Sequence, residues 1–177
     1  QPKKNSIKLP EVEHINNKIN YNQIRALADS KSLRLRFSDN KTFKSFEPEG
    51  NISKKLYKIA EKIRCEKLGS DRFKGVKNNI ESYYQERINL LDLKNSEDKI
   101  IESFENYLRV KFLDLKNETQ IDKKIRSFKK DLSEKFKSKI NDLKNLTLDQ
   151  EKYNSMISEI ICKMRLDESF KEDEKKN

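Results

Sequence analysis

This chain of 177 residues has little glycine, proline, histidine or cysteine, and it has no tryptophan. It contains three glycines, three prolines, two cysteines and one histidine. A β-rich fold needs many tight turns, which depend on glycine and proline, so this scarcity argues against a sheet-based architecture. Lysine, glutamate, isoleucine and leucine are abundant instead and favour helices. The composition therefore predicts an all-α, multi-helix domain.

The shortage of histidine, cysteine and clustered glycine also limits the chemistry. Cys65 and Cys162 lie far apart and His14 is the only histidine, so no transition-metal site has its usual ligand spacing. A Ser-His-Asp or Cys-His arrangement would have to use His14, which lies in a polar segment. The glycines form no phosphate-binding loop. We therefore expect no catalytic residue, no metal ligand and no cofactor in this chain.

Long apolar runs are absent from the sequence. A membrane-spanning helix needs about 20 mostly apolar residues, and no stretch approaches that length. Residues 1–20 have a basic start but lack the apolar stretch of a secretory signal. Two distant cysteines suit a reducing compartment. These absences lead us to expect a cytoplasmic protein that makes no membrane contact.

The net charge of +10, from 40 basic and 30 acidic residues, raises the question of nucleic-acid binding. Only nine of the basic residues are arginines, the type preferred for bidentate contacts to phosphates and bases. The lysines are spread among glutamates and aspartates, a pattern typical of a solvated helical surface. Nucleic acid is therefore not the expected partner. A basic helical nucleic-acid-binding module is nevertheless kept as an alternative.

Apolar residues recur at helical spacing from residue 21 to residue 166, the extent of the predicted helical domain. Within it the stretch 33–37 alternates like a strand, so the local pattern leaves helix and strand open there. We expect helices at 21–39, near 43–46, from 51–53 to 69, 76–91, 96–115, 119–143 and 153–164. The last two should form a long antiparallel hairpin. Residues 1–20 are expected to be extended or disordered, and 167–177 to be a disordered charged tail.

All three glycines, Gly50, Gly69 and Gly75, lie at expected element boundaries. Gly69 follows the last apolar residue of its helix, where a left-handed C-cap is expected, and a loop should run from there to Gly75. We therefore predict an elbow between two helices. Its candidate residues are Glu61, Arg64, Glu66, Gly69, Arg72, Gly75 and Asn79. Two roles are open for them: fixing the angle between the helices, or contacting a partner.

The elbow also carries a family resemblance. Residues 61–69 read Glu-x-x-Arg-x-Glu-x-x-Gly, and residues 72–79 read Arg-x-x-Gly-Val-x-x-Asn. Upstream lie Lys8-Leu9-Pro10-Glu11 and a run from Arg25 that ends in Pro48-Glu49-Gly50. With these motifs the chain resembles the N-terminal region of the CobT subunit of aerobic, ATP-dependent cobaltochelatase.

The resemblance is most specific between residues 25 and 84, and it extends to Asp167 mainly in apolar spacing. It favours helix over strand at 33–37. The chain differs from the family in two respects. Histidines that the family often has near Ser38 and Phe43 are absent. The chain also ends where the family enters an acidic linker and a von Willebrand A-type domain with an Asp-x-Ser-x-Ser motif, so we expect a fragment or a shortened relative.

The resemblance implies a role in a motor-driven metal chelatase, a ligase that forms metal–nitrogen bonds. In that family CobT pairs with an AAA+ ATPase subunit, CobS, and the two act on a large subunit, CobN. The complex uses ATP, Mg²⁺ and cobalt to insert the metal into hydrogenobyrinic acid a,c-diamide. The resemblance thus implies a non-catalytic adaptor domain. An adaptor for an AAA+ ATPase acting on another client is the alternative within the same class.

Overall fold

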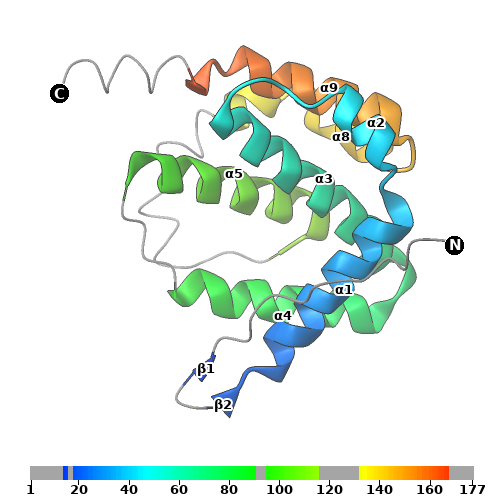
Figure 1. The fold of residues 1–177 in the computed structure, drawn as a ribbon, viewed down its shortest axis with the longest axis vertical. Coiled ribbons are helices and arrows are strands. Elements are labelled where there is room, and N and C mark those ends of the chain that lie inside the picture. Colours follow the sequence, from blue (N-terminus) through cyan, green and yellow to red (C-terminus); the bar gives the residue numbers. More distant parts are fainter. Residues whose placement is uncertain (1–13, 16–17, 91–94, 116–131, 168–177) are drawn as a thin grey trace, which may run out of the picture.

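Helix α3, Asn51–Arg72, is the central element of the chain. The structure, a computed structural model, describes residues 14–15, 18–90, 95–115 and 132–167. The other elements are β1 (His14–Ile15), β2 (Lys18–Ile19), α1 (Tyr21–Phe37), α2 (Asn40–Ser45), α4 (Lys74–Leu90), α5 (Ser96–Leu113), α8 (Ile140–Asn145) and α9 (Gln150–Lys163) (Figure 1). The strands form one short antiparallel hairpin, and the predicted all-α class is confirmed.

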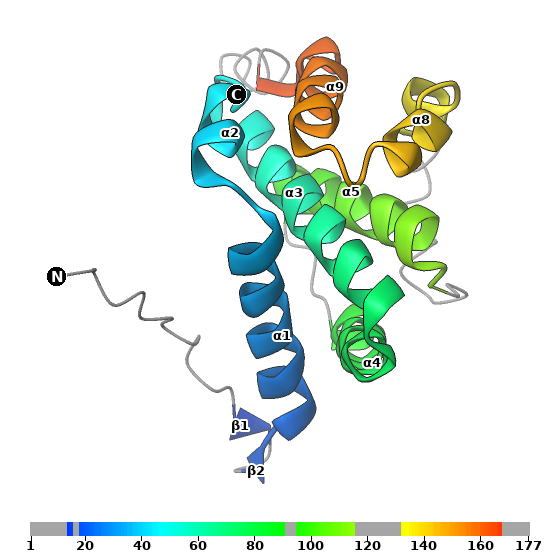
Figure 2. The same ribbon diagram turned by 90° about the vertical axis from the view of Figure 1, so that its right-hand side faces the viewer.

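Helix α3 packs against α1, α4, α5 and α9, and Figure 2 shows it between α1 and α5. Its apolar side chains recur every three or four residues, so they share one face. Leu56, Tyr57, Ala60 and Ile63 on that face are fully buried. Burying one large apolar side chain contributes about 1.5–3 kcal/mol. This face therefore determines where the neighbouring helices lie.

The first two helices begin at side-chain caps and meet at a short connection. Asn20 caps α1 by accepting a hydrogen bond from the Gln23 amide at 3.1 Å. Asp39 caps α2 by accepting from the Thr42 amide at 2.7 Å. Such caps satisfy amides that have no partner within their helix. The stretch 33–37 is helical, which confirms the expectation drawn from the family resemblance.

Helices α9 and α4 lie on opposite sides of α3, and α9 completes the core on its side (Figure 1). Tyr153 donates a hydrogen bond to the Ala60 carbonyl at 3.1 Å. At the start of α9, Gln150 accepts from the Asp39 amide at 2.7 Å and donates to the Asp39 carbonyl at 3.0 Å. These contacts fix α9 to both α3 and the α1–α2 connection, which are distant in sequence.

The predicted end of α3 at Gly69 is wrong. The helix continues to Arg72, Phe73 alone separates it from α4, and the expected loop from Ser70 to Gly75 does not form. Gly69 has no left-handed backbone, and a Cβ atom there would lie 2.3 Å from a methyl of Leu33. Glycine is thus needed for close approach of α1, not for a cap. The left-handed glycine is Gly50, with φ of 93°.

A single helix from 119 to 143 is also wrong. Residues 132–136 are helical, 137–139 form a turn, and α8 starts again at Ile140. The first part of the expected helix, 119–131, lies outside the described residues. The antiparallel hairpin therefore stays a prediction. Residues 1–13 and 168–177, for which we expected an extended segment and a charged tail, also lie outside the described part.

Candidate functional site

The seven residues predicted for the elbow separate into an inner and an outer group. Glu61, Arg64 and Glu66 are at most 1% exposed, and Gly69 is buried beside Leu33. Arg72 and Gly75 are exposed and Asn79 is half-buried. The segment from α3 through Phe73 into α4 therefore carries a buried group of residues and a more exposed group, and the two groups have different neighbours.

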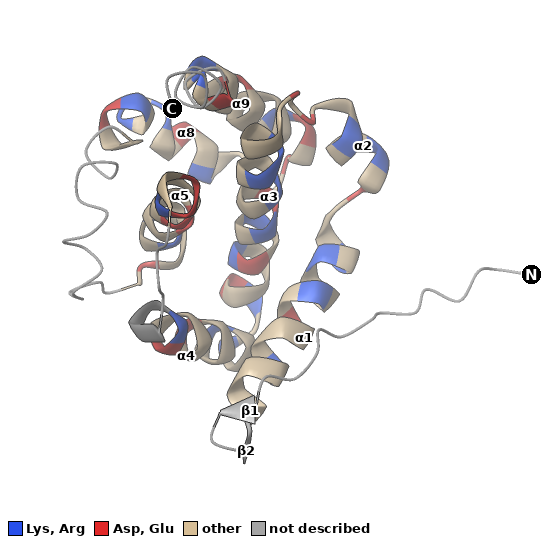
Figure 3. Ribbon diagram, turned by 60° about the vertical axis from the view of Figure 1, so that its left-hand side comes forward, with Lys and Arg blue, Asp and Glu red and all other residues tan. Residues whose placement is uncertain are grey.

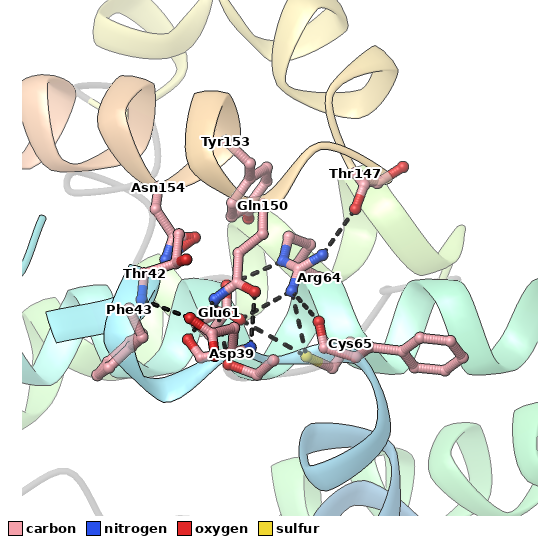
Figure 4. A network of polar contacts seen from close by, with 12 residues as sticks. Asp39, Thr42, Phe43, Glu61, Arg64, Cys65, Thr147, Gln150, Tyr153 and Asn154 are labelled. Atoms are coloured by element: carbon pink, nitrogen blue, oxygen red, sulfur yellow. Dashed lines mark hydrogen bonds and ion pairs between the residues drawn. The ribbon is translucent and has the colours of Figure 1, made fainter. Parts of the chain in front are cut away.

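Arg64 joins three parts of the fold (Figure 4). Its guanidinium donates to both carboxylate oxygens of Glu61, each at 2.9 Å. It also donates to the carbonyl of Phe37 at 2.6 Å and to that of Thr147 at 2.8 Å. Burial alone would lower the pKa of Arg64, but the bonds to Glu61 outweigh it and raise that pKa. Arg64 therefore stays charged and ties α3 to the ends of α1 and α8.

Cys65 lies next to this ion pair but is not a reactive thiol. Burial, reinforced by the charge of Glu61, raises the pKa of Cys65 to about 12. The side chain is fully buried and forms no disulfide. A thiol that stays protonated is a poor nucleophile and a poor metal ligand. Cys65 therefore acts as a small packing residue.

A second buried ion-pair network surrounds Arg109 of α5. Arg109 donates to Glu105 at 2.9 and 3.0 Å and also bonds Glu66 of α3. Glu66 accepts in addition from the Ser30 hydroxyl of α1 at 2.6 Å. The Arg109 guanidinium stacks on the Tyr84 ring of α4, 3.2 Å from its centroid. The guanidinium thus joins α3, α4 and α5, and Glu66 links α1 to them.

The charges in this second network balance. Its basic members are Lys62, Arg87 and Arg109, and its acidic members are Glu66, Glu102 and Glu105. Burial would raise the pKa of Glu105, but Arg109, Lys62 and Arg87 together lower it to about 2. Burial raises the pKa of Glu102 above its ordinary value. A buried charge is costly unless it is paired, so these groups are committed to one another.

Both inner networks serve the packing of the helices. In the described part of the chain, no group of three or more His, Cys, Asp or Glu side chains could hold a metal ion. Each buried carboxylate of α3 instead contacts a guanidinium: Glu61 meets Arg64, and Glu66 meets Arg109. The predicted residues Glu61, Arg64 and Glu66 thus act from inside the fold.

Sequence reasoning missed three residues whose polar contacts hold α3 in place: Glu105, Arg109 and Asp167. Glu105 and Arg109 lie four apart on α5, beside the buried Phe104 and Leu108. That position next to an apolar face was a signal for a buried ion pair. Asp167 had no local signal, because its partners are 114 and 115 residues away. It accepts from the Ile52 and Ser53 amides and so caps α3, whose own N-cap residue is a glycine.

The outer part of the elbow borders a groove. The groove measures about 540 Å³ and lies between α1 and the start of α4. It is lined by Asp29, Ser32, Leu33, Leu35, Arg36, Phe73 and Val76. Asn79 donates to the Asp29 carboxylate at 2.8 Å, so it fixes α4 to α1 rather than holding a loop. Leu35 is 58% exposed and Phe73 44% exposed in this groove.

Arg36 lines the groove, and Arg72, which precedes the lining residue Phe73, lies over the same aromatic ring as Arg36. Arg36 and Arg72 lie 5.7 and 4.9 Å from the centroid of Phe37. Neither forms an ion pair with any other described residue. Figure 3 shows further basic turns on the C-terminal half of α1 and on α2. The outer surface of the elbow is therefore apolar at its base and basic at its edge.

No helix in the described ranges is long and apolar enough to cross a membrane. Among known proteins, the family model described as cobalamin biosynthesis protein CobT matches residues 1–177. No curated protein and no solved structure matches the chain. A family match along the full sequence agrees with the motifs of residues 61–79, whose side chains hold α1, α3, α4 and α5 together. The chain belongs to the CobT family, and its role is in cobalamin biosynthesis.

Proposed function

We propose that this chain is a non-catalytic adaptor domain in a cobaltochelatase complex, where it helps an AAA+ ATPase subunit, CobS, act on a large subunit, CobN. The observation that carries the proposal is the CobT family match over residues 1–177. The reaction served is cobalt insertion into hydrogenobyrinic acid a,c-diamide. The cobalt ion is the substrate of the complex, and no residue of this chain is assigned to hold it.

The division of the elbow into inner and outer surfaces supports an adaptor role. An adaptor that transmits force between two subunits needs a body that keeps its shape and a surface that is free to bind. The contacts of Arg64 and Arg109 join α1, α3, α4, α5 and the α8–α9 connection inside the body. The groove beside Arg36 and Arg72 is exposed.

The energetics of the reaction also favour a division of labour. A hydrated divalent cation must give up bound water molecules before it can enter a macrocycle, and this dehydration is costly. A conformational cycle driven by ATP in the partner can supply the work. ATP and Mg²⁺ are then assigned to the AAA+ subunit. We place the complex in the cytoplasm, where ATP is available.

A capture experiment tests this proposal. The chain is immobilised and offered the AAA+ subunit and the large subunit separately, then together with ATP. We expect stable capture of the AAA+ subunit, and capture of the large subunit that depends on it. Capture of neither subunit would contradict the proposal. Capture of the AAA+ subunit without the large one, under all nucleotide conditions, would favour an adaptor for another client.

The salt dependence of nucleic-acid binding distinguishes an adaptor from a nucleic-acid-binding module. The net charge of +10 gives any DNA or RNA binding a strong electrostatic component. Titration of single- and double-stranded DNA and of RNA at several salt concentrations measures that component. Only weak binding that disappears at physiological salt is expected. Tight binding that persists there would favour the nucleic-acid-binding module instead.

A further inference from the structure

We propose that the groove between α1 and the start of α4 is a docking site for an acidic protein segment that inserts an apolar side chain beside a carboxylate. The groove is lined by the apolar residues Leu33, Leu35, Phe73 and Val76 and by Arg36. Arg72 precedes Phe73 in the chain and lies over the same Phe37 ring as Arg36. This inference deepens the proposed function, on which it rests in one respect: the chain is taken to have a protein partner.

The base of the groove suits an apolar side chain. Leu35 and Phe73 are two of the four large apolar residues that stand out as exposed in the described part of the chain, and both lie in this groove. Leu35 is on α1 and Phe73 is the residue between α3 and α4, so separate elements bring them together. Covering this apolar area removes it from water and therefore stabilises a complex.

The edge of the groove suits carboxylates. The Arg36 and Arg72 guanidiniums both lie over the Phe37 ring, which restricts where they can move. A guanidinium held in this way keeps its N–H groups available in a fork that matches a carboxylate. Inside the domain, Arg64 and Arg109 each have such a carboxylate. Arg36 and Arg72 have none among the described residues, so a partner with acidic side chains is the complement.

The groove favours a protein segment over nucleic acid. Asp29 lines it seven residues before Arg36 on α1, about two helical turns away, and its carboxylate accepts a hydrogen bond from Asn79. A nucleic acid carries a phosphate at every nucleotide and would bring one close to Asp29. A protein segment can place carboxylates at the arginines alone. Three of the four apolar lining residues, Leu33, Leu35 and Val76, are aliphatic, so Phe73 is the one lining ring on which a base could stack.

Selection from a library of random short peptides on phage tests the inference with the full chain as bait. We expect enriched peptides to combine Asp or Glu with a large apolar residue. When synthesised, they should bind the double variant Arg36→Glu, Arg72→Glu and the variant Leu35→Ser about tenfold or more weakly than the unaltered chain. Fluorescence anisotropy measures these affinities, and thermal melts show that each variant is folded.

Matched variants control for charge and exposure. The double variant Lys54→Glu, Lys58→Glu makes the same change in net charge on exposed positions of α3. Leu148→Ser removes a 75% exposed leucine outside the groove. Both should bind the enriched peptides as the unaltered chain does. Losses as large as those of the groove variants would overturn the inference, because they would reflect net charge or general hydrophobicity.

Other occupants of the groove give different results. Failure to enrich any peptide, or enrichment of peptides without acidic residues, would overturn the inference. Single-stranded DNA whose binding needs Arg36 and Arg72 would assign the groove to nucleic acid. Self-association that Leu35→Ser abolishes, seen by light scattering, would assign it to a second copy of the chain. Each of these results contradicts docking of an acidic segment.

The same variants separate this inference from the proposed function. If the chain captures chelatase subunits and the groove variants capture them equally well, the inference fails and the proposed function stands. If the chain captures neither subunit but selects acidic peptides through the groove, the proposed function fails and the docking site stands.

Discussion

Two pairs of arginines in this domain have opposite surroundings. Arg64 and Arg109 are each 1% exposed and each bonds a carboxylate on its own helix. Arg36 and Arg72 are exposed and stack on Phe37 without a carboxylate among the described residues. The comparison shows that one residue type has two uses here. The inner arginines hold helices together, and the outer ones remain available to a partner.

The energetic consequences differ as well. Removing one member of a buried ion pair leaves an uncompensated charge and is costly. Removing an exposed arginine changes stability by about 0.5 kcal/mol or less. The predictions that follow test this difference, beginning with the variant that should have the largest effect.

Replacing Arg109 with alanine should destabilise the domain most. The change leaves Glu66 and Glu105 buried without their guanidinium and removes the cation that stacks on Tyr84. We expect a loss of about 3–5 kcal/mol in the free energy of unfolding, measured by urea denaturation. Arg25→Ala, on an exposed position of α1, is the matched control and should stay near the original stability. A loss below about 1 kcal/mol for Arg109→Ala would show that the network is dispensable.

The inner network should also give the domain an acid-sensitive stability. The pKa of Glu105 falls from 4.5 to about 2 on folding. A carboxyl whose folded pKa is lowered stabilises the fold above its unfolded pKa, and this contribution is lost as pH falls toward the folded pKa. Stability should therefore decline between pH 4.5 and about 2. The pKa of Glu102 is raised by burial, so its opposite effect lies above this window.

Glu105→Gln isolates this effect from other carboxyls. Exposed acids with lowered pKa values, such as Asp39 and Glu159, contribute equally in both proteins. Urea denaturation at a series of pH values should show a shallower decline for the variant than for the unaltered chain. Parallel declines would mean that Glu105 does not carry the acid sensitivity.

Adding a side chain should lower stability at Gly69 but not at Gly75, the other glycine within a helix. Valine at Gly69 would collide with Leu33 on α1, and overpacking of this kind typically costs about 1–3 kcal/mol. At Gly75 nothing lies within 4 Å of an added Cβ, so Gly75→Ala should be neutral or stabilise by up to about 1 kcal/mol. Thermal melts of both variants measure the difference. A neutral Gly69→Val would remove the role assigned to close approach of α1 and α3.

Removing the long-range cap of α3 should have a smaller effect. Asp167→Ala deprives the amides of Ile52 and Ser53 of their acceptor, and loss of a helix cap costs about 0.5–2 kcal/mol. Asp142→Ala, at an exposed position, serves as the control. Hydrogen exchange should show faster exchange at Ile52 and Ser53 in the Asp167 variant only. Unchanged exchange at both amides would contradict the capping role.

Helix periodicity was sufficient to predict most elements, because regularly spaced apolar side chains, such as Leu56 and Ile63 of α3, need a common buried face. It was not sufficient at Gly69, since the close neighbour of that residue comes from Leu33 on another helix. The turn at 137–139 was missed for a related reason, because an uninterrupted apolar pattern does not reveal a local break.

Prediction of the candidate site met the same limit. The motif residues Glu61, Arg64 and Glu66 were identifiable in the sequence, yet their spacing is equally compatible with a surface ion pair. Their burial follows from packing against α1, α5 and α9, which local pattern does not encode. The groove depends on the fold bringing Leu35 of α1 to the same place as Phe73 of the α3–α4 connection, and the positions of Arg36 and Arg72 depend on Phe37.

The comparison of Arg64→Ala with Arg72→Ala tests the central claim most directly, because both variants make the same chemical change on α3. Urea denaturation should show a loss of about 3–5 kcal/mol for Arg64→Ala and of about 0.5 kcal/mol or less for Arg72→Ala. Arg72→Ala should nevertheless weaken binding of groove-selected acidic peptides, which Arg64→Ala should retain under conditions where it is folded. Equal losses of stability in the two variants, with peptide affinity unchanged by Arg72→Ala, would contradict the division between inner and outer arginines.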